Sequence, residues 1–280
     1  MTAIDKTADK NVAIHRNWFA LYAASDMTDV HPILDNATFR MCANKRELAL
    51  TEAMSAFTEA YAARHETLIE HKVLRRQGFK SIDYFTENGM SLLPPDEYRR
   101  IRQLVGKTRP QCEFLVGGFD LMGIGHVFKQ DNSGPAQCFD EPGWWAIGCG
   151  EGEAIGALEF QAHRLGFDKD CTEAMCVYHL LSAKFTAECN RLVGRNTFVT
   201  CHAFNKPIRF MSEHSTETVR EAWERSAIPK MPKGVVRRIP RMLVTRRQVE
   251  HHHKTMEDLE RKIFGRRLQK RIDADRETTG

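Results

Sequence analysis

The sequence predicts an α+β fold in which strands and helices form separate layers. Its β-like and helical segments come in runs, in the order strands, helices, strands, helices, strand. Strict alternation of single strands and helices would instead favour a doubly wound parallel sheet. With 280 residues, 42% of them hydrophobic, the chain can bury a substantial core.

The first run of strands lies in residues 11–26. Val12 and Ile14 lie at alternating positions before the polar turn 15–17, and an alternating segment from Trp18 to Tyr22 follows it. This pattern predicts a hairpin. A short helix should begin near Met27, and a long one should span about 45–75. The long segment brings six apolar residues near one stripe: Leu50, Ala53, Met54, Phe57, Tyr61 and Leu68.

Residues 77–96 contain Asn-Gly and Pro-Pro, so we expect a loop with at most one helical turn, followed by a short helix from Asp96. Strands are predicted over 112–120, 123–131 and 143–150, with a turn at 131–134. Further expected elements are helices at 151–165 and 172–192, a strand at 196–204, a helix at 214–226, a proline-rich linker at 229–242 and a polar helix at 250–275. The predicted domains are 1–207 and 208–280.

The glycine-rich stretch 143–156, GWWAIGCGEGEAIG, could form a phosphate cradle or a close-packed turn. Glu153 stands where a dinucleotide fingerprint needs its third glycine. Glu151 and Glu153 would lie in the first turn of the next helix, where carboxylates repel an anion. The stretch therefore predicts a close-packed turn and no nucleotide cofactor.

Composition favours a cytoplasmic protein without membrane spans, because the first twenty residues are charged and no apolar run is long enough to span a bilayer. Eight cysteines are scattered without a Cys-x-x-Cys pair, which indicates reduced thiols rather than a disulfide framework or zinc site. Three successive histidines, 251–253, point in different directions on a helix, so we expect a solvated patch and no metal site.

Several segments together resemble the proteasome-type N-terminal-nucleophile (Ntn) hydrolases, which include proteasome subunits and the bacterial peptidase HslV. The residues that carry the resemblance are FLVGGFDLMGIGHVFKQDNSG, WWAIGCGEGEAIGAL, KNVAIHRNWFALYAASD and AECNRLVGRNTFVT, within Lys10 to Ala203. The resemblance implies a four-layer α-β-β-α sandwich. It also implies that the glycine turn lets a helix leave the sheet beside an active site.

The family's chemistry, by the same resemblance, is amide-bond hydrolysis by an N-terminal threonine that uses its own amine as base. Lys10 stands where the family's catalytic lysine is expected, and the backbone of Ala24 where the oxyanion donor is expected. Tyr22 and Asp26 would then line the side that binds a peptide or protein substrate. Assembly with copies of itself or with related subunits is implied as well.

The sequence departs from the family pattern in two respects. The nine residues before Lys10 cannot supply the hairpin that carries the nucleophile. At the positions that assist the nucleophile in the family, Cys149 stands in place of a serine, and Asn190 and Val193 stand in place of an aspartate and a serine. Three explanations stay open: a nucleophile upstream of this start, a non-catalytic relative, or Thr2 as nucleophile after removal of Met1. An extended chain from Thr2 to Lys10 spans roughly 26 Å, so contact is sterically allowed. We expect an inactive peptidase that self-assembles.

Two further alternatives concern single features. Cys149 could be a nucleophile at a helix N-terminus, but the neighbouring glutamates favour a packed or redox-sensitive thiol. Residues 230–280 carry fifteen Lys/Arg and seven Asp/Glu, which makes nucleic-acid or acidic-partner binding the second functional hypothesis. The interleaved acidic residues and scarce aromatic residues count against it.

Overall fold

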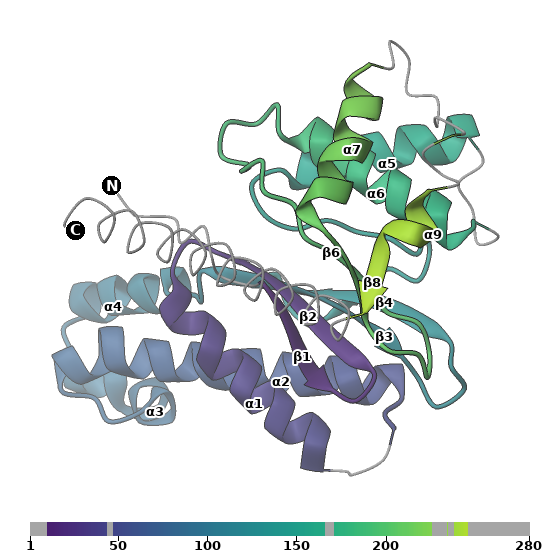
Figure 1. Cartoon of the computed structure of the whole chain (residues 1–280). Helices are drawn as coiled ribbons and strands as arrows, with labels where there is room; N and C mark the ends of the chain where they lie inside the picture. Colours follow the sequence, from purple (N-terminus) through teal and green to yellow (C-terminus); the bar gives the residue numbers. More distant parts are fainter. Residues whose placement is uncertain (1–9, 44–46, 166–170, 226–233, 235–237, 246–280) are drawn as a thin grey trace, which may run out of the picture. The chain divides into compact units, whose positions relative to one another are not determined.

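The computed structural model describes residues 10–43, 47–165, 171–225, 234 and 238–245 (Figure 1). The chain separates into two compact units. Unit 1 contains residues 1–170 and 186–194, and unit 2 contains residues 171–185 and 195–280. Helices occur together with two antiparallel sheets, which is the mixed composition that the sequence predicts. The boundary proposed at residue 207 stays a prediction.

The sheet of unit 1 is an antiparallel meander of five strands in the order β1-β2-β3-β4-β5 (Figure 1). Its strands are β1 (Asn11–His15), β2 (Trp18–Ala24), β3 (Cys112–Phe119), β4 (Gly125–Gln130) and β5 (Gln137–Cys138). The predicted hairpin and the next two predicted strands are thereby confirmed. The register places Leu21 opposite Leu115, and Val116 opposite Phe128.

Two helices cover one face of this sheet: α1 (Val30–Ala43) and α2 (Leu50–Ile69) (Figure 1). Strand residues alternate between faces, so every second side chain points toward the helices. Trp18, Ala20 and Tyr22 of β2 are accordingly buried in one core with residues of α1 and α2. The predicted α2 stripe is confirmed at its centre, where Phe57 is fully buried with its ring 5.7 Å from that of Phe114.

Gly118 allows two rings to stack across the sheet. Trp18 pairs with Gly118, and Gly118 pairs with His126, so the three lie in one row. A Cβ at Gly118 would overlap the Trp18 indole. Because this position carries no side chain, the rings of Trp18 and His126 stack with an interplanar angle of 4° and a centroid separation of 6.2 Å.

The expectation of a loop over 77–96 is wrong, because most of this stretch is helical. Helices α3 (Ile82–Leu92) and α4 (Pro95–Lys107) form there. Ser81 caps α3 by accepting a hydrogen bond from the backbone N–H of Tyr84. Phe85 and Ile101 are buried in one cluster with Phe79, and this apolar contact outweighs the helix-breaking Asn-Gly pair.

The predicted strand over 143–150 is also wrong, because these residues form no ladder with any described strand. Trp144 is nonetheless buried, and the ring of Trp145 stacks on Phe139 at 3.8 Å. Helix α5 (Glu151–Leu165) begins where the sequence predicts. The two tryptophans are therefore held by packing, without backbone pairing to a described strand.

Unit 2 contains a three-stranded antiparallel sheet in the order β6-β7-β8. Its elements are α6 (Glu173–Ala187, whose last two residues belong to unit 1), β6 (Val199–Cys201), β7 (Arg209–Met211), α7 (Glu213–Glu224), α9 (Ile239–Met242) and β8 (Leu243–Thr245). The helices predicted near 172–192 and 214–226 are confirmed, with α6 ending earlier. Tyr178, Phe185 and Val219 are buried in one cluster. Trp223 Nε1 donates to Ser182 Oγ at 2.9 Å.

Candidate functional site

The glycine turn at residues 148–150 lies against the sheet of unit 1, and we take it as the candidate site. Gly148 has φ +92°, a conformation that favours glycine. Its N–H donates to Glu113 Oε1 on β3 at 2.7 Å. A Cβ on Gly148 would lie 3.4 Å from Cβ of Ala23, near the end of β2. The turn therefore lies beside the end of the β2 strand.

The other side of the turn contacts residues 187–193. A Cβ on Gly150 would come within 2.6 Å of Val193 Cγ2 and 3.0 Å of Ala187 Cβ. The Asn190 side chain donates from Nδ2 to the Cys149 carbonyl at 2.6 Å. It also reaches Glu153 Oε1 at 3.3 Å. The prediction of a close-packed turn is confirmed, since side chains occupy the space next to the glycines.

A largely buried lysine connects this turn to the sheet. Lys129 on β4, whose side chain is 11% exposed, lies 3.0 Å from Glu113 Oε2, 3.0 Å from Glu151 Oε1 and 3.4 Å from Asp131 Oδ2. Burial lowers the pKa of Lys129, but the hydrogen bonds and negative charges of Glu113 and Glu151 outweigh this and raise it overall. Lys129 therefore acts as a fixed cation rather than as a neutral nucleophile or base.

The sequence-predicted site residues occupy different environments. Cys149 and Ala24 are exposed. Lys10 is exposed too, and since Asn11 pairs with Leu21, extending this register by one residue would place Lys10 opposite Tyr22. The structure brings the turn that contains Cys149 close to Ala23, which directly precedes Ala24 at the end of β2. Thr2 lies outside the described residues.

Two of these residues have structural roles that differ from substrate binding. Tyr22 is 5% exposed and belongs to the core under α1 and α2, because it shares the strand face of Trp18. Asp26 caps the short 3₁₀ helix Met27–Asp29 by accepting from Thr28 N at 2.9 Å and Thr28 Oγ1 at 2.7 Å. The bond from the Thr28 backbone, then that from its hydroxyl, lowers the pKa of Asp26.

Sequence reasoning missed a charged cluster around His126. Its Nδ1 lies 2.7 Å from Asp140 Oδ2, and its Nε2 lies 3.4 Å from Asp120 Oδ2. Burial raises the pKa of both aspartates, but other contributions outweigh it. At Asp120 these are the hydrogen bond from the Ile124 backbone and the nearby His126 side chain, and at Asp140 they are hydrogen bonds from His126 and the Val127 backbone. Both pKa values are lowered overall. The cluster fixes the ends of the β3–β4 turn.

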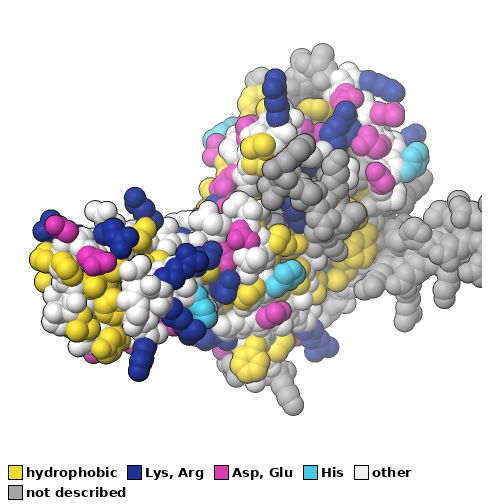
Figure 2. Space-filling model, turned by 90° about the vertical axis from the view of Figure 1, so that its left-hand side faces the viewer, with side chains coloured by type: hydrophobic (Ala, Val, Ile, Leu, Met, Phe, Trp, Pro, Cys, Tyr) yellow, Lys and Arg dark blue, Asp and Glu magenta, His cyan; other side chains and the backbone are white. Residues whose placement is uncertain are grey.

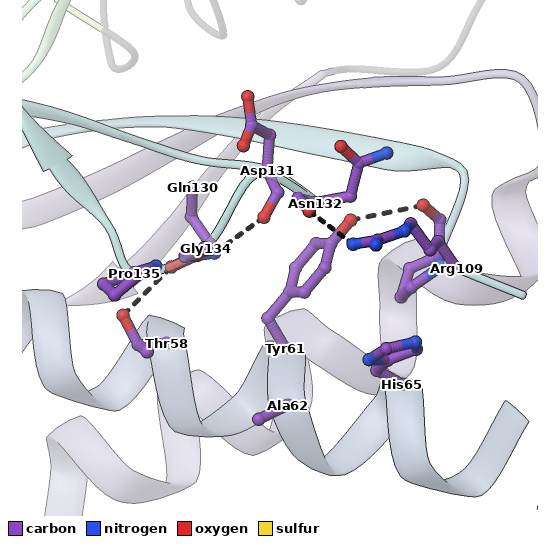
Figure 3. Close-up of a pocket in the computed structure, with 11 residues that line it drawn as sticks. Thr58, Tyr61, Ala62, His65, Arg109, Gln130, Asp131, Asn132, Gly134 and Pro135 are labelled. Carbon is purple, nitrogen blue, oxygen red and sulfur yellow. Dashed lines mark hydrogen bonds between the residues drawn. The ribbon is translucent and has the colours of Figure 1, made fainter. Parts of the chain in front are cut away.

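A groove of about 300 Å³ lies along α2 and was also missed (Figure 3). Thr58, Tyr61, Ala62 and His65 line it from α2 at helical spacing, opposite residues 109–110 and the turn 130–135. We call this the α2 groove. Tyr61 Oη donates to the Pro110 and Cys112 carbonyls at 3.2 and 3.1 Å. The spacing of its α2 residues was visible in the sequence, but the facing turn was not.

Side chains of both charges are interspersed with hydrophobic ones on the face shown in Figure 2, without a continuous stripe of one sign over its described part. No described helix is long and apolar enough to cross a membrane. Within the described ranges, no group of three or more His, Cys, Asp or Glu side chains is arranged to hold a metal ion. The histidines 251–253 lie outside these ranges.

Comparison with known protein families finds no family model that matches the chain, and comparison with curated proteins finds no matching relative.

Proposed function

We propose that this chain has the four-layer proteasome-type Ntn-hydrolase fold and acts as a self-assembling subunit without peptidase activity of its own. The order of elements supports the proposal: a hairpin, two helices, strands that join the same sheet, and a glycine turn that leads into α5. The resemblance to proteasome-type Ntn hydrolases implies the same order of elements. The position of the glycine turn beside the end of β2 supports it as well.

The observation that favours a non-catalytic subunit is the identity of two residues, Asn190 and Val193, at positions that assist the nucleophile in the family. The resemblance expects an aspartate and a serine where this chain has Asn190 and Val193. Asn190 uses its amide on the Cys149 carbonyl and on Glu153, and Val193 packs close to Gly150. Neither side chain can accept a proton in the manner of a carboxylate, so both stabilise the turn instead.

Covalent labelling by a peptide epoxyketone tests this proposal, because that reagent requires a free N-terminal threonine. The protein should be purified from its native cell, with its intact mass and N-terminal sequence determined first. We expect no adduct and no peptide hydrolysis, while an active threonine peptidase treated in parallel is labelled. An adduct on the native protein that disappears in Lys10→Ala would overturn the non-catalytic assignment and support a working peptidase.

A second candidate function is binding of nucleic acid or another acidic partner by residues 230–280. This segment contains fifteen basic and seven acidic residues, and its net positive charge favours such binding. Most of this segment, residues 246–280, lies outside the described residues.

A further inference from the structure

We propose that Asp120, His126 and Asp140 form a pH-sensitive latch, in which the doubly protonated ring of His126 orders the β3–β4 turn, residues 120–124. The three residues come from the turn itself, from β4 and from the segment after β5, and all belong to unit 1. The latch is a property of the folded chain, so it depends neither on catalysis nor on assembly with other subunits.

The ring of His126 lies between two carboxylates. Its Nδ1 is 2.7 Å from Asp140 Oδ2, and its Nε2 is 3.4 Å from Asp120 Oδ2, an ion-pair contact without the alignment of a hydrogen bond. Ionised carboxylates only accept hydrogen bonds, so both contacts are attractive when each ring nitrogen carries a proton. A neutral ring has one N–H, which leaves a lone pair of the other nitrogen facing a negative charge.

The longer of the two contacts is the one that reaches into the turn. A neutral ring would keep its proton on the shorter bond to Asp140, and its Nε2 would then repel Asp120. The same Asp120 side chain organises the turn, because its Oδ1 accepts from the N–H groups of Met122 and Ile124 at 2.9 and 2.8 Å. A displaced Asp120 carboxylate would therefore weaken the bonds that order the turn.

The ring of His126 is held in place from its other sides. Trp18 stacks on it with an interplanar angle of 4°. Asp140, which accepts from its Nδ1, is itself fixed because its Oδ1 accepts from the N–H of Val127 at 3.0 Å. The His126 side chain is 11% exposed, so water screens its charge less than at an open surface. The charge on the ring, rather than a movement of the ring, therefore determines how strongly Asp120 is held.

The ionisable groups around His126 leave it as the member that changes charge near neutral pH. Among the described residues, Asp120 and Asp140 are the charged side chains in contact with it, and their lowered pKa values keep both ionised. Cys138 on β5 hydrogen-bonds Asp140, and burial is the main reason that the pKa of its thiol is raised, so the thiol stays neutral. Histidine ordinarily changes charge between pH 5 and pH 8.

The latch should hold within a window of pH. Its attraction is lost as the pH rises and His126 gives up its second proton, and it is also lost in acid, as the pH falls through the folded-state pKa values of the aspartates. The turn carries three exposed apolar side chains, Leu121, Met122 and Ile124. Protonation of His126 therefore controls how firmly these side chains are presented to solvent.

Amide hydrogen exchange of the full-length protein, measured by NMR between pH 5 and pH 8, tests the latch, with the ring nitrogens of His126 observed in the same samples. After correction for the intrinsic effect of pH, protection of the Met122 and Ile124 amides should fall about three- to ten-fold as His126 loses its second proton. The Val127 amide, which bonds Asp140, should stay protected. Protection of Met122 and Ile124 that does not follow the protonation of His126 overturns the proposal, and so does a ring that loses no proton in this range.

His126→Gln separates the charge of the ring from other effects of pH, because glutamine is neutral throughout. We expect low protection of Met122 and Ile124 in this variant at every pH, without the step seen in the wild type. His31→Gln changes an exposed histidine on α1 and should keep the wild-type profile. A wild-type profile in His126→Gln would contradict the latch. If circular dichroism showed that this variant does not fold, the titration of the wild-type protein would still decide.

Discussion

At the scale of single residues, glycines decide how closely segments approach one another. Gly118 leaves room for the Trp18 indole beside His126, and Gly150 leaves room for Val193. Both positions matter through the space that a missing side chain provides, whereas Gly148 matters through its positive φ as well. Sequence reasoning foresaw the close turn at 148–150, but could not foresee the neighbours that make it close.

Gly150→Ala should destabilise the protein by about 1–3 kcal/mol, because its Cβ would lie 2.6 Å from Val193 Cγ2 and 3.0 Å from Ala187 Cβ. Urea unfolding measures the change. Gly152→Ala is the matched control: nothing lies within 4 Å of its added Cβ, and alanine favours the helix by up to about 1 kcal/mol. Equal effects of the two substitutions would contradict the close packing of the turn.

Asp140 should contribute to stability in a pH-dependent way. Its pKa is lowered in the folded protein, so its contribution is present above the unfolded-state pKa of about 3.9 and is lost as the pH falls through the folded-state value. We therefore expect Asp140→Asn to show a smaller loss of stability between pH 5 and pH 3 than the wild type. Thermal unfolding at both pH values measures this.

The control for this measurement is Asp35→Asn, which changes an exposed aspartate on α1. It should leave the pH dependence near that of the wild type. If Asp140→Asn also retained the full acid-induced loss, the bond between His126 and Asp140 would not be the source of the effect.

At the scale of elements, packing overrode local signals in two places. The Asn-Gly pair in α3 predicts a turn, yet Gly89 lies against the rings of Phe85 and Tyr98 inside a helix. The run from Trp144 to Ile147 predicts a strand, yet it pairs with no described strand. Both errors arise because apolar residues indicate burial without indicating what will cover them.

Helix α2 contributes a large aromatic side chain to the core of unit 1. Phe57 is fully buried, and its ring lies 5.7 Å from those of Phe114 and Phe128. Phe57→Ala should therefore cost about 3–5 kcal/mol in chemical denaturation, since it leaves a cavity. Phe39→Ala, at a side chain that is 77% exposed, should change stability by no more than about 0.5 kcal/mol. Similar losses in both variants would show that the α2 face is not central.

At the scale of the whole molecule, the basic residues of 230–280 provide a test of the second candidate function. If six or more phosphates were contacted, affinity for double-stranded DNA should fall about a thousand-fold or more between 50 and 200 mM salt. Fluorescence anisotropy measures this. Deleting residues 246–280 should remove the binding. Weak, salt-independent binding that survives the deletion would exclude an electrostatic role for the segment.

The sequence by itself determined the class of the fold, most of the strands and helices, and the close turn at 148–150. These features follow from residue spacing and from glycines and carboxylates next to one another, which are local properties. Only the tertiary structure decided that Asn190 bonds Cys149, that Lys129 faces carboxylates from other segments, and that residues far apart in the chain line the α2 groove. Contacts of this kind depend on the register of the sheet and on which helix covers which face, and a single sequence does not encode either locally.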